Sequence, residues 1–150
     1  MEIERKFKVK RLPEGLDRYP KSRIQQAYLC REPVVRVRQR DDELWLTCKG
    51  QGLLTREEFE LPLSREAYDH LLAKADGNVI TKDRICIPLG ERTIELDVFH
   101  GSLEGLLLAE VEFPTEGEAL AFTAPDWFGE EVTYDPAYCN SNLSKEGAKP

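Results

Sequence analysis

The sequence predicts a mainly β protein of the α+β class, folded as a closed eight-stranded antiparallel β-barrel. This barrel would form a tunnel with a charged lumen and with helices packed outside. Three observations favour this fold. Most segments between residues 2 and 113 alternate with a period of two, which is typical of half-buried strands. Turn residues separate these segments. Seven of the eight predicted strands place charge on a single face, and several of these faces carry a single sign.

The length and composition indicate one globular domain, which we expect to span residues 1–150. Apolar residues make up 41% and charged residues 33% of the chain, which allows a core but gives more charge than an average surface needs. The net charge of −7 argues against nucleic acid or an anionic membrane as a partner. The 4 cysteines form no metal-binding motif. No run approaches the ~20 apolar residues of a membrane helix, so we expect a cytoplasmic protein.

The first part of the chain contains five predicted strands. The opening EIERKFKV, residues 2–9, places two glutamates and then two lysines on one face, and the loop RLPEGLDRYP ends it. The next strands are separated by REP, by Asp41-Asp42 and by the Gly50-Gln51-Gly52 turn. They are predicted at 23–30, 34–40, 43–49 and 54–61.

Two helices and three strands follow. Ser64 is a suitable N-cap for a helix through EAYDHLLAKA, which Gly77 ends. The last strands are predicted at 79–87, 92–99 and 106–113. A second helix is predicted in GEALAFTA, before Pro125. The aromatic residues of the tail then indicate a short docked helix or a lid.

The segregation of charge by sign is the main functional signal. VRVRQR places Arg36, Arg38 and Arg40 on one face, whereas IELD and EVE carry only carboxylates on theirs. A solvated face of an antiparallel sheet is the common explanation for any single charged strand. Such faces normally mix signs, however, because like charges on one face repel each other. The clusters therefore indicate charged ligands.

Closure into a barrel would turn these charged faces inward. The apolar faces, which include Phe59 and Leu61, would then point outward and need covering by the helices and the tail. Uncompensated buried charge is costly, so the lumen would hold water, ions or a charged ligand. The predicted inward carboxylates are Glu2, Glu4, Glu58, Glu60, Glu95, Asp97, Glu110 and Glu112, and the predicted inward cations are Lys6, Lys8, Arg36, Arg38, Arg40, Lys49, Arg56, Lys82 and Arg84.

These two groups together indicate the chemistry of the ligand. Arginine and lysine side chains bind phosphate oxygens. Clustered carboxylates without histidine or thiolate suit hard cations such as Mg²⁺ or Mn²⁺. A metal-bound polyphosphate would satisfy both groups at once.

The ordered motifs EIERKF, RVR, KG, REEFE, KDR, IELD and AEVEF resemble those of the CYTH superfamily, also called triphosphate tunnel metalloenzymes. The resemblance covers residues 2 to about 143. EIERKF alone is a weak signal, whereas the ordered set is specific. The resemblance implies an eight-stranded antiparallel tunnel that hydrolyses triphosphates with a divalent metal or, in some branches, cyclises them. The family includes inorganic triphosphatases, thiamine triphosphatases and class IV adenylyl cyclases.

The resemblance also implies roles for individual residues. Glu2 and Glu4 match the metal-binding pair of the family, with Glu112 as a third ligand and Glu110 beside it. Further tunnel carboxylates, also candidates for the metal, are Glu95 and Asp97. The matched phosphate contacts are Lys6, Arg36, Arg38, Lys49, Arg56, Lys82 and Arg84. Lys8 and Arg40 alternate correctly on their strands and would lie toward a mouth of the tunnel, where Lys8 is a further candidate for phosphate.

Catalysis of phosphoryl transfer depends mostly on positioning and on stabilising charge. Arg56 and Lys82 are therefore candidate catalytic residues. The attacking water would be activated either by a second metal ion or by Glu58 or Glu60 as a base. The sequence favours neither alternative.

Three functions remain open. The first is a metal-dependent hydrolase of inorganic triphosphate or of a small organic triphosphate. The second is an adenylyl cyclase that converts ATP to cyclic AMP, which needs a nucleotide pocket that no motif indicates. The third is a polyphosphate-binding module without turnover, which would gain nothing from a full set of carboxylates. A homodimer is also left open.

Overall fold

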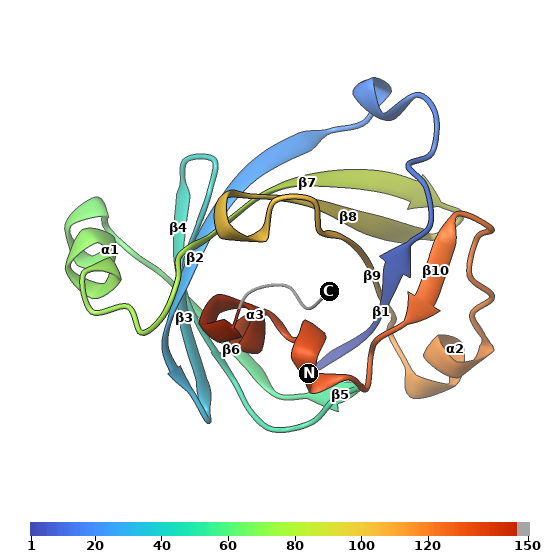
Figure 1. The fold of residues 1–150 in the computed structure, drawn as a ribbon. Helices are drawn as coiled ribbons and strands as arrows, with labels where there is room; N and C mark the ends of the chain where they lie inside the picture. Colours follow the sequence, from blue (N-terminus) through green and yellow to red (C-terminus); the bar gives the residue numbers. More distant parts are fainter. Residues whose placement is uncertain (147–150) are drawn as a thin grey trace.

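The computed structural model describes residues 1–146 and contains a ten-stranded antiparallel sheet (Figure 1). The strands are β1 (Glu2–Val9), β2 (Lys21–Arg31), β3 (Val34–Arg40), β4 (Glu43–Lys49), β5 (Thr55–Arg56), β6 (Glu58–Pro62), β7 (Ile80–Leu89), β8 (Arg92–His100), β9 (Leu107–Glu112) and β10 (Phe128–Glu131). The helices are α1 (Arg65–Leu72), α2 (Glu116–Ala121) and α3 (Asn140–Glu146), with 3-10 turns η1 (Leu16–Arg18), η2 (Gly101–Leu103) and η3 (Pro136–Tyr138). No helix in this part of the chain is long and apolar enough to cross a membrane.

The sheet curves around a central space, but its hydrogen-bonded path does not close. The order is β10-β1-β9-β8-β7-β2-β3-β4-β6, and β5 pairs with β1 beside this path. The strand predicted over 54–61 is two strands, because Arg56 pairs with Glu2 whereas Glu58 pairs with Lys49. Between them, the carbonyl of Glu57 accepts a hydrogen bond from the N–H of Gly50 (3.0 Å). The closed eight-stranded barrel is therefore not confirmed, and the sheet is a curved one of ten strands.

The tail adds a strand that the sequence did not predict. β10 pairs with β1 at Phe7 and Val9, so β1 has β9 along one edge and both β5 and β10 along the other. After β10, η3 and α3 lie inside the curve of the sheet (Figure 1). The prediction that helices pack outside is thus wrong for α3.

The other two helices pack on the outer face of the sheet, as predicted. α1 begins where the Oγ of Ser64 accepts a hydrogen bond from the N–H of Ala67 (3.1 Å). Its Tyr68 is fully buried in an apolar cluster with residues of β2 and β3. α2 begins at Thr115, which caps it in the same way, and it packs against β1.

Two apolar side chains on the outer face remain uncovered, contrary to expectation. Phe59 is 73% exposed and Leu61 is 54% exposed. Both belong to β6, which is one end of the hydrogen-bonded path. The helices therefore cover only part of the outer face.

The register of the ladders brings the charged faces to the same side of the sheet. Glu4 pairs with Glu112 and Lys6 pairs with Glu110 between β1 and β9. Glu95 of β8 also pairs with Glu110. Directly paired residues of an antiparallel ladder have their side chains on the same face. The charged faces predicted from the sequence therefore meet inside the curve.

The same inner faces become apolar at one end. Val34 lies two residues before Arg36, and Ile80 lies two residues before Lys82, so each shares the face of its charged neighbour. These residues form a buried cluster with Leu143 of α3 and with other apolar side chains. The inner space is charged along most of its length and apolar where η3 and α3 pack.

Candidate active site

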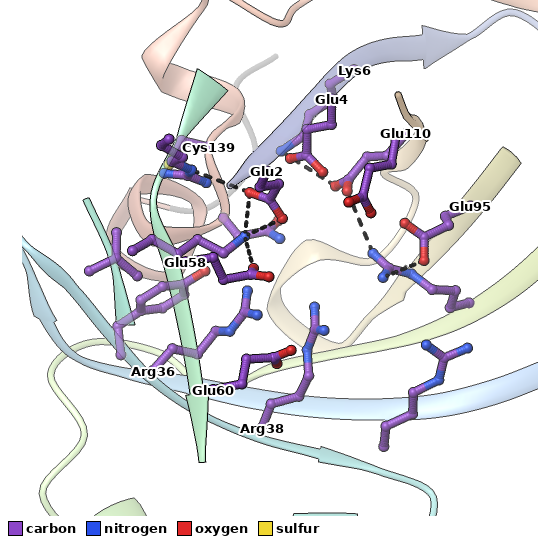
Figure 2. A pocket seen from close by; sticks show the side chains of 18 residues that line it. Glu2, Glu4, Lys6, Arg36, Arg38, Glu58, Glu60, Glu95, Glu110 and Cys139 are labelled. Atoms are coloured by element: carbon purple, nitrogen blue, oxygen red, sulfur yellow. Dashed lines mark hydrogen bonds and ion pairs between the residues drawn. The ribbon is translucent and has the colours of Figure 1, made fainter. Parts of the chain in front are cut away.

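The inner faces of the strands enclose a cavity of about 170 Å³ (Figure 2). Its lining is mostly charged. The carboxylates are Glu2, Glu4, Glu58, Glu60, Glu95, Glu110 and Glu112, the cations are Lys6, Arg36, Arg38, Arg40, Lys49, Arg56 and Arg84, and the remaining residues are Tyr28, Val34, Cys139 and Asn140. Most of the site residues predicted from the sequence therefore lie together.

Three of the predicted site residues do not line this cavity. Lys8 lies toward solvent, with its Nζ 3.4 Å from Glu130 and its side chain 41% exposed. Lys82 and Asp97 lie at the opposite extreme, because both side chains are fully buried. The alternation placed these two residues on the inner face correctly, but they contact each other instead of the cavity.

Asp97 is the centre of a buried ion cluster. Its Oδ2 accepts hydrogen bonds from the Nζ of Lys82 (2.6 Å) and from an Nη of Arg84 (2.9 Å), and its Oδ1 accepts one from the Nε of Arg84 (2.8 Å). Burial opposes ionisation, but the charges of Arg84 and Lys82 hold the pKa of Asp97 below its usual value. Burial lowers the pKa of Lys82 to about 8 despite the attraction of Asp97. Both oxygens of Asp97 are thus bound to protein cations.

The cations of β3 have no such partners. Among the described residues, no carboxylate lies within 4.0 Å of the guanidinium of Arg36, Arg38 or Arg40. The Nε of Arg36 is buried and has no hydrogen-bond partner in this part of the chain. The Nε of Arg38 donates to the Oε1 of Gln26 (3.0 Å). Burial, together with the charges of Arg36 and Arg84, lowers the pKa of Arg38 to about 9. This side of the cavity suits an anion.

Several carboxylates of the cavity are held by lysine or arginine. Both oxygens of Glu2 accept hydrogen bonds from the Nζ of Lys49, at 2.9 and 3.0 Å. Glu110 lies 3.5 Å from the Nζ of Lys6, and Glu95 lies 3.0 Å from Arg84. Lys6 and Glu110 are directly paired between β1 and β9, and Arg84 and Glu95 come from the neighbouring strands β7 and β8. Figure 2 shows Glu2, Glu95 and Glu110 around the cavity.

Glu4 and Glu112 differ from the carboxylates that lysine or arginine holds. They pair directly between β1 and β9, and neither forms an ion pair with the cations that the structure describes. Burial and the charges of Glu110 and Glu2 raise the pKa of Glu4 to about 8. Burial and the charges of Glu2 and Glu95 also raise the pKa of Glu112. A cation bound beside Glu4 and Glu112 would offset the repulsion that each experiences from neighbouring carboxylates.

A divalent cation fits this pair of carboxylates. Hard oxygen donors suit Mg²⁺ and Mn²⁺, and Mg²⁺ commonly binds through one or two carboxylates together with phosphate oxygens and water. No three acidic, histidine or cysteine side chains among those described converge into a complete metal cage. The donors present therefore suit a metal ion that takes its remaining ligands from a bound phosphate and from water.

The cavity also contains residues for which the sequence gave little signal. The alternation of β2 showed that Tyr28 could face inward, and the structure places it there. Cys139 and Asn140 reach the lining through the turn between η3 and α3. The backbone carbonyl of Tyr138 accepts a hydrogen bond from the Nζ of Lys6 (3.0 Å). No local pattern marks such contacts, because they depend on where the tail docks.

Comparison with known proteins finds relatives over the whole chain, although no protein-family model matches. The inorganic triphosphatase of Nitrosomonas europaea is 40% identical over 149 residues, covering 95% of this chain and 96% of the relative. That of Acetivibrio thermocellus is 39% identical over 158 residues, covering 99% of this chain and 96% of the relative.

Solved structures share the fold. The crystal structure of an inorganic triphosphatase superposes with a TM-score of 0.72 at 36% identity, covering 100% of this chain and 97% of that chain. A protein from Hippeastrum, described as an adenylyl cyclase candidate with a dominant triphosphatase activity, gives a TM-score of 0.64 at 14% identity, covering 81% of this chain and 83% of that chain. At this lower identity the likeness concerns the fold alone.

Proposed function

Because this chain belongs to the triphosphate tunnel metalloenzyme (CYTH) family of its inorganic triphosphatase relatives, we propose that it hydrolyses inorganic triphosphate with a divalent metal ion. The observation that supports this proposal is that the cavity has a side of unpaired arginines and a side of unpaired carboxylates among the described residues. Among the described residues, the arginines of β3 form no ion pair with a carboxylate, and Glu4 and Glu112 form none with a cation. A triphosphate with a bound metal ion supplies what each side lacks.

The cations of the cavity would hold the phosphate groups. Arg36, Arg38 and Arg40 offer guanidinium groups that no carboxylate of the described chain neutralises. Lys49 and Arg84 would exchange part of their contacts with carboxylates for phosphate oxygens. Holding the chain of phosphates in line and stabilising developing charge supplies most of the catalysis of phosphoryl transfer. Arg56, which lies 3.5 Å from Glu2 at one side of the cavity, is a candidate for this role.

Glu4 and Glu112 would hold the metal ion, with Glu2 and Glu110 beside them. When bound, a divalent ion neutralises phosphate charge and lowers the pKa of bound water. Mg²⁺ and Mn²⁺ both suit this donor set. Asp97 has no free oxygen toward the cavity, so we assign it to the support of Lys82 and Arg84.

Two carboxylates of β6 are candidates for taking the proton of the attacking water. Burial and the charge of Glu2 raise the pKa of Glu58, which favours uptake of a proton. Glu60 lies nearer to solvent, where its Oε2 accepts a hydrogen bond from the hydroxyl of Thr47 (3.2 Å). Both line the cavity and would therefore lie near phosphates bound in it.

The lining favours inorganic triphosphate over nucleoside or thiamine triphosphates. Tyr28 and Val34 are the apolar or aromatic residues among those that line the cavity, and both lie toward the end filled by the tail. A nucleobase or thiazole ring would find mostly charged groups, which favour phosphate instead.

Turnover of three candidate substrates tests the proposal. The purified protein is incubated with tripolyphosphate, thiamine triphosphate or ATP, each with Mg²⁺ or Mn²⁺, and orthophosphate and cyclic AMP are measured. We expect fastest release of orthophosphate from tripolyphosphate and no cyclic AMP. Arg38→Gln should abolish most of this release, whereas Arg18→Gln, on the exposed turn η1, should not. Formation of cyclic AMP, or binding of tripolyphosphate without any turnover, would contradict the proposal.

A further inference from the structure

Gln26 contacts Arg38, a residue of the cavity lining, without lining the cavity itself. It lies on β2 directly opposite Arg38 in the β2–β3 ladder, and its side chain is fully buried. Its Oε1 accepts a hydrogen bond from the Nε of Arg38 (3.0 Å), while its Nε2 has no partner among the described residues. Gln26 does not line the cavity itself. Any effect on a bound phosphate must therefore pass through Arg38.

The acceptor for Arg38 differs in charge from those of Lys49 and Arg84. Lys49 is held by the carboxylate of Glu2, and Arg84 is held by the carboxylate of Asp97. Arg38 is instead oriented by an amide, which fixes the direction of the guanidinium without neutralising its charge. Because the Nε of Arg38 donates to Gln26, its two terminal nitrogens are available to phosphate. A guanidinium can bind two phosphate oxygens at once through two parallel hydrogen bonds.

We propose that Gln26 is a positioning residue for the substrate: it fixes Arg38 through a neutral oxygen, so that the full positive charge of Arg38 acts on a phosphate group. This inference rests on the proposed function. A glutamate at this position would hold Arg38 more strongly, because a hydrogen bond between charged groups is stronger than one to an amide. It would also compete with the phosphate. Gln26 therefore favours substrate binding at the expense of the stability of the free protein.

The variant Gln26→Glu tests this trade-off because its two readouts move in opposite directions. The new carboxylate pairs with Arg38 and reduces the repulsion among Arg36, Arg38 and Arg84. We expect the Tm of the ligand-free protein to stay the same or rise. We expect KM for tripolyphosphate to rise by about tenfold or more, equivalent to about 1.4 kcal/mol of lost binding. A KM within twofold of the wild type, or a higher KM accompanied by a lower Tm, would overturn the inference.

Gln26→Leu provides an independent comparison. It removes the hydrogen bond to Arg38 but adds no charge, so KM should rise less than in Gln26→Glu. If Gln26 served only to pack and to hold Arg38 in place, the glutamate would be the better substitute. The reverse order of the two KM values would therefore overturn the inference, even if one variant were less stable.

Gln25→Glu is the matched control. Gln25 is the neighbouring residue on the opposite face of β2, where its Oε1 accepts a hydrogen bond from the hydroxyl of Tyr68 (3.0 Å). The same charge added there should leave KM within twofold of the wild type. An equal rise in both variants would show an effect of net charge and would overturn the inference. If the wild type releases no phosphate from tripolyphosphate, the proposed function fails. If it does so and Gln26→Glu keeps its KM, only the role of Gln26 fails.

Discussion

Replacing Asp97 by asparagine distinguishes a carboxylate that supports the site from one that binds metal. The carboxylate of Asp97 is fully buried and accepts hydrogen bonds from Lys82 and Arg84 at 2.6–2.9 Å. Asparagine keeps the size of the side chain but removes the charge and replaces one acceptor by an N–H donor. Lys82 then loses its carboxylate partner, and Arg84 keeps only its contacts with Glu95 and Glu110.

The expected loss of stability is large. Breaking a buried ion pair by removing one partner costs about 3–5 kcal/mol. In a chain of this size, about 1 kcal/mol corresponds to roughly 2–4 °C in Tm. The metal-free variant Asp97→Asn should therefore unfold roughly 6–20 °C below the wild type.

Unfolding in the presence of EDTA measures this difference without a contribution from bound metal. Glu95→Gln is the control, because Glu95 lies two residues away on the same face, is 25% exposed and has a single bond to Arg84 (3.0 Å). Its loss should cost less than about 1 kcal/mol. If Asp97→Asn in EDTA matched the wild type and lost only the stabilisation by Mg²⁺, Asp97 would be a metal ligand and the present reasoning would be wrong.

Three further predictions concern metal, pH and ligand. Excess EDTA should stop phosphate release from tripolyphosphate, and added Mg²⁺ or Mn²⁺ should restore it; undiminished turnover in EDTA would contradict the need for metal. Because the pKa of Glu4 is raised from 4.5 to about 8, this group stabilises the fold least at high pH: its contribution is complete below pH 4.5 and is lost as pH rises through about 8. Glu4→Gln should remove this trend in metal-free unfolding measured across that range, and an unchanged trend would assign it to another group. Finally, tripolyphosphate at a hundredfold excess over Kd should stabilise the protein by about 2.7 kcal/mol, and an equal rise in Tm with matched sulfate would show that the cavity does not recognise a triphosphate.

The sequence predicted correctly which residues of β7 face inward, but it did not predict which of them reach the cavity and which are buried within the protein. A period of two assigns Lys82 and Arg84 to the same face of β7, and both do face inward. Only Arg84 reaches the cavity, whereas Lys82 is fully buried between Asp97 and the ring of Phe99 on the neighbouring strand. Depth depends on the register between strands, which alternation within one strand does not contain.

The fold was predictable to a similar extent. Strands of six or more residues have enough alternation to be recognised, whereas the four residues FGEE of β10 do not. A single strand over 54–61 was predicted because the alternation runs through Glu57. In the structure, Glu57 separates the pairing of Arg56 with β1 from the pairing of Glu58 with β4. Whether one residue interrupts a ladder depends on the positions of both neighbouring strands.

The place of β1 in the sheet has a consequence for the order in which the chain assembles. Glu4 pairs with Glu112 and Phe7 pairs with Glu131, so β1 pairs with strands that the ribosome makes long after it. Until residue 107 has been synthesised, the nascent chain carries the arginines of β3 but neither β9 nor its carboxylates. Pairings between residues so distant in the sequence slow folding. The carboxylates of the site also come together only when β1 and β9 pair to complete the sheet. Deleting β9 or β10 would therefore leave β1 without a hydrogen-bonded neighbour along part of one edge.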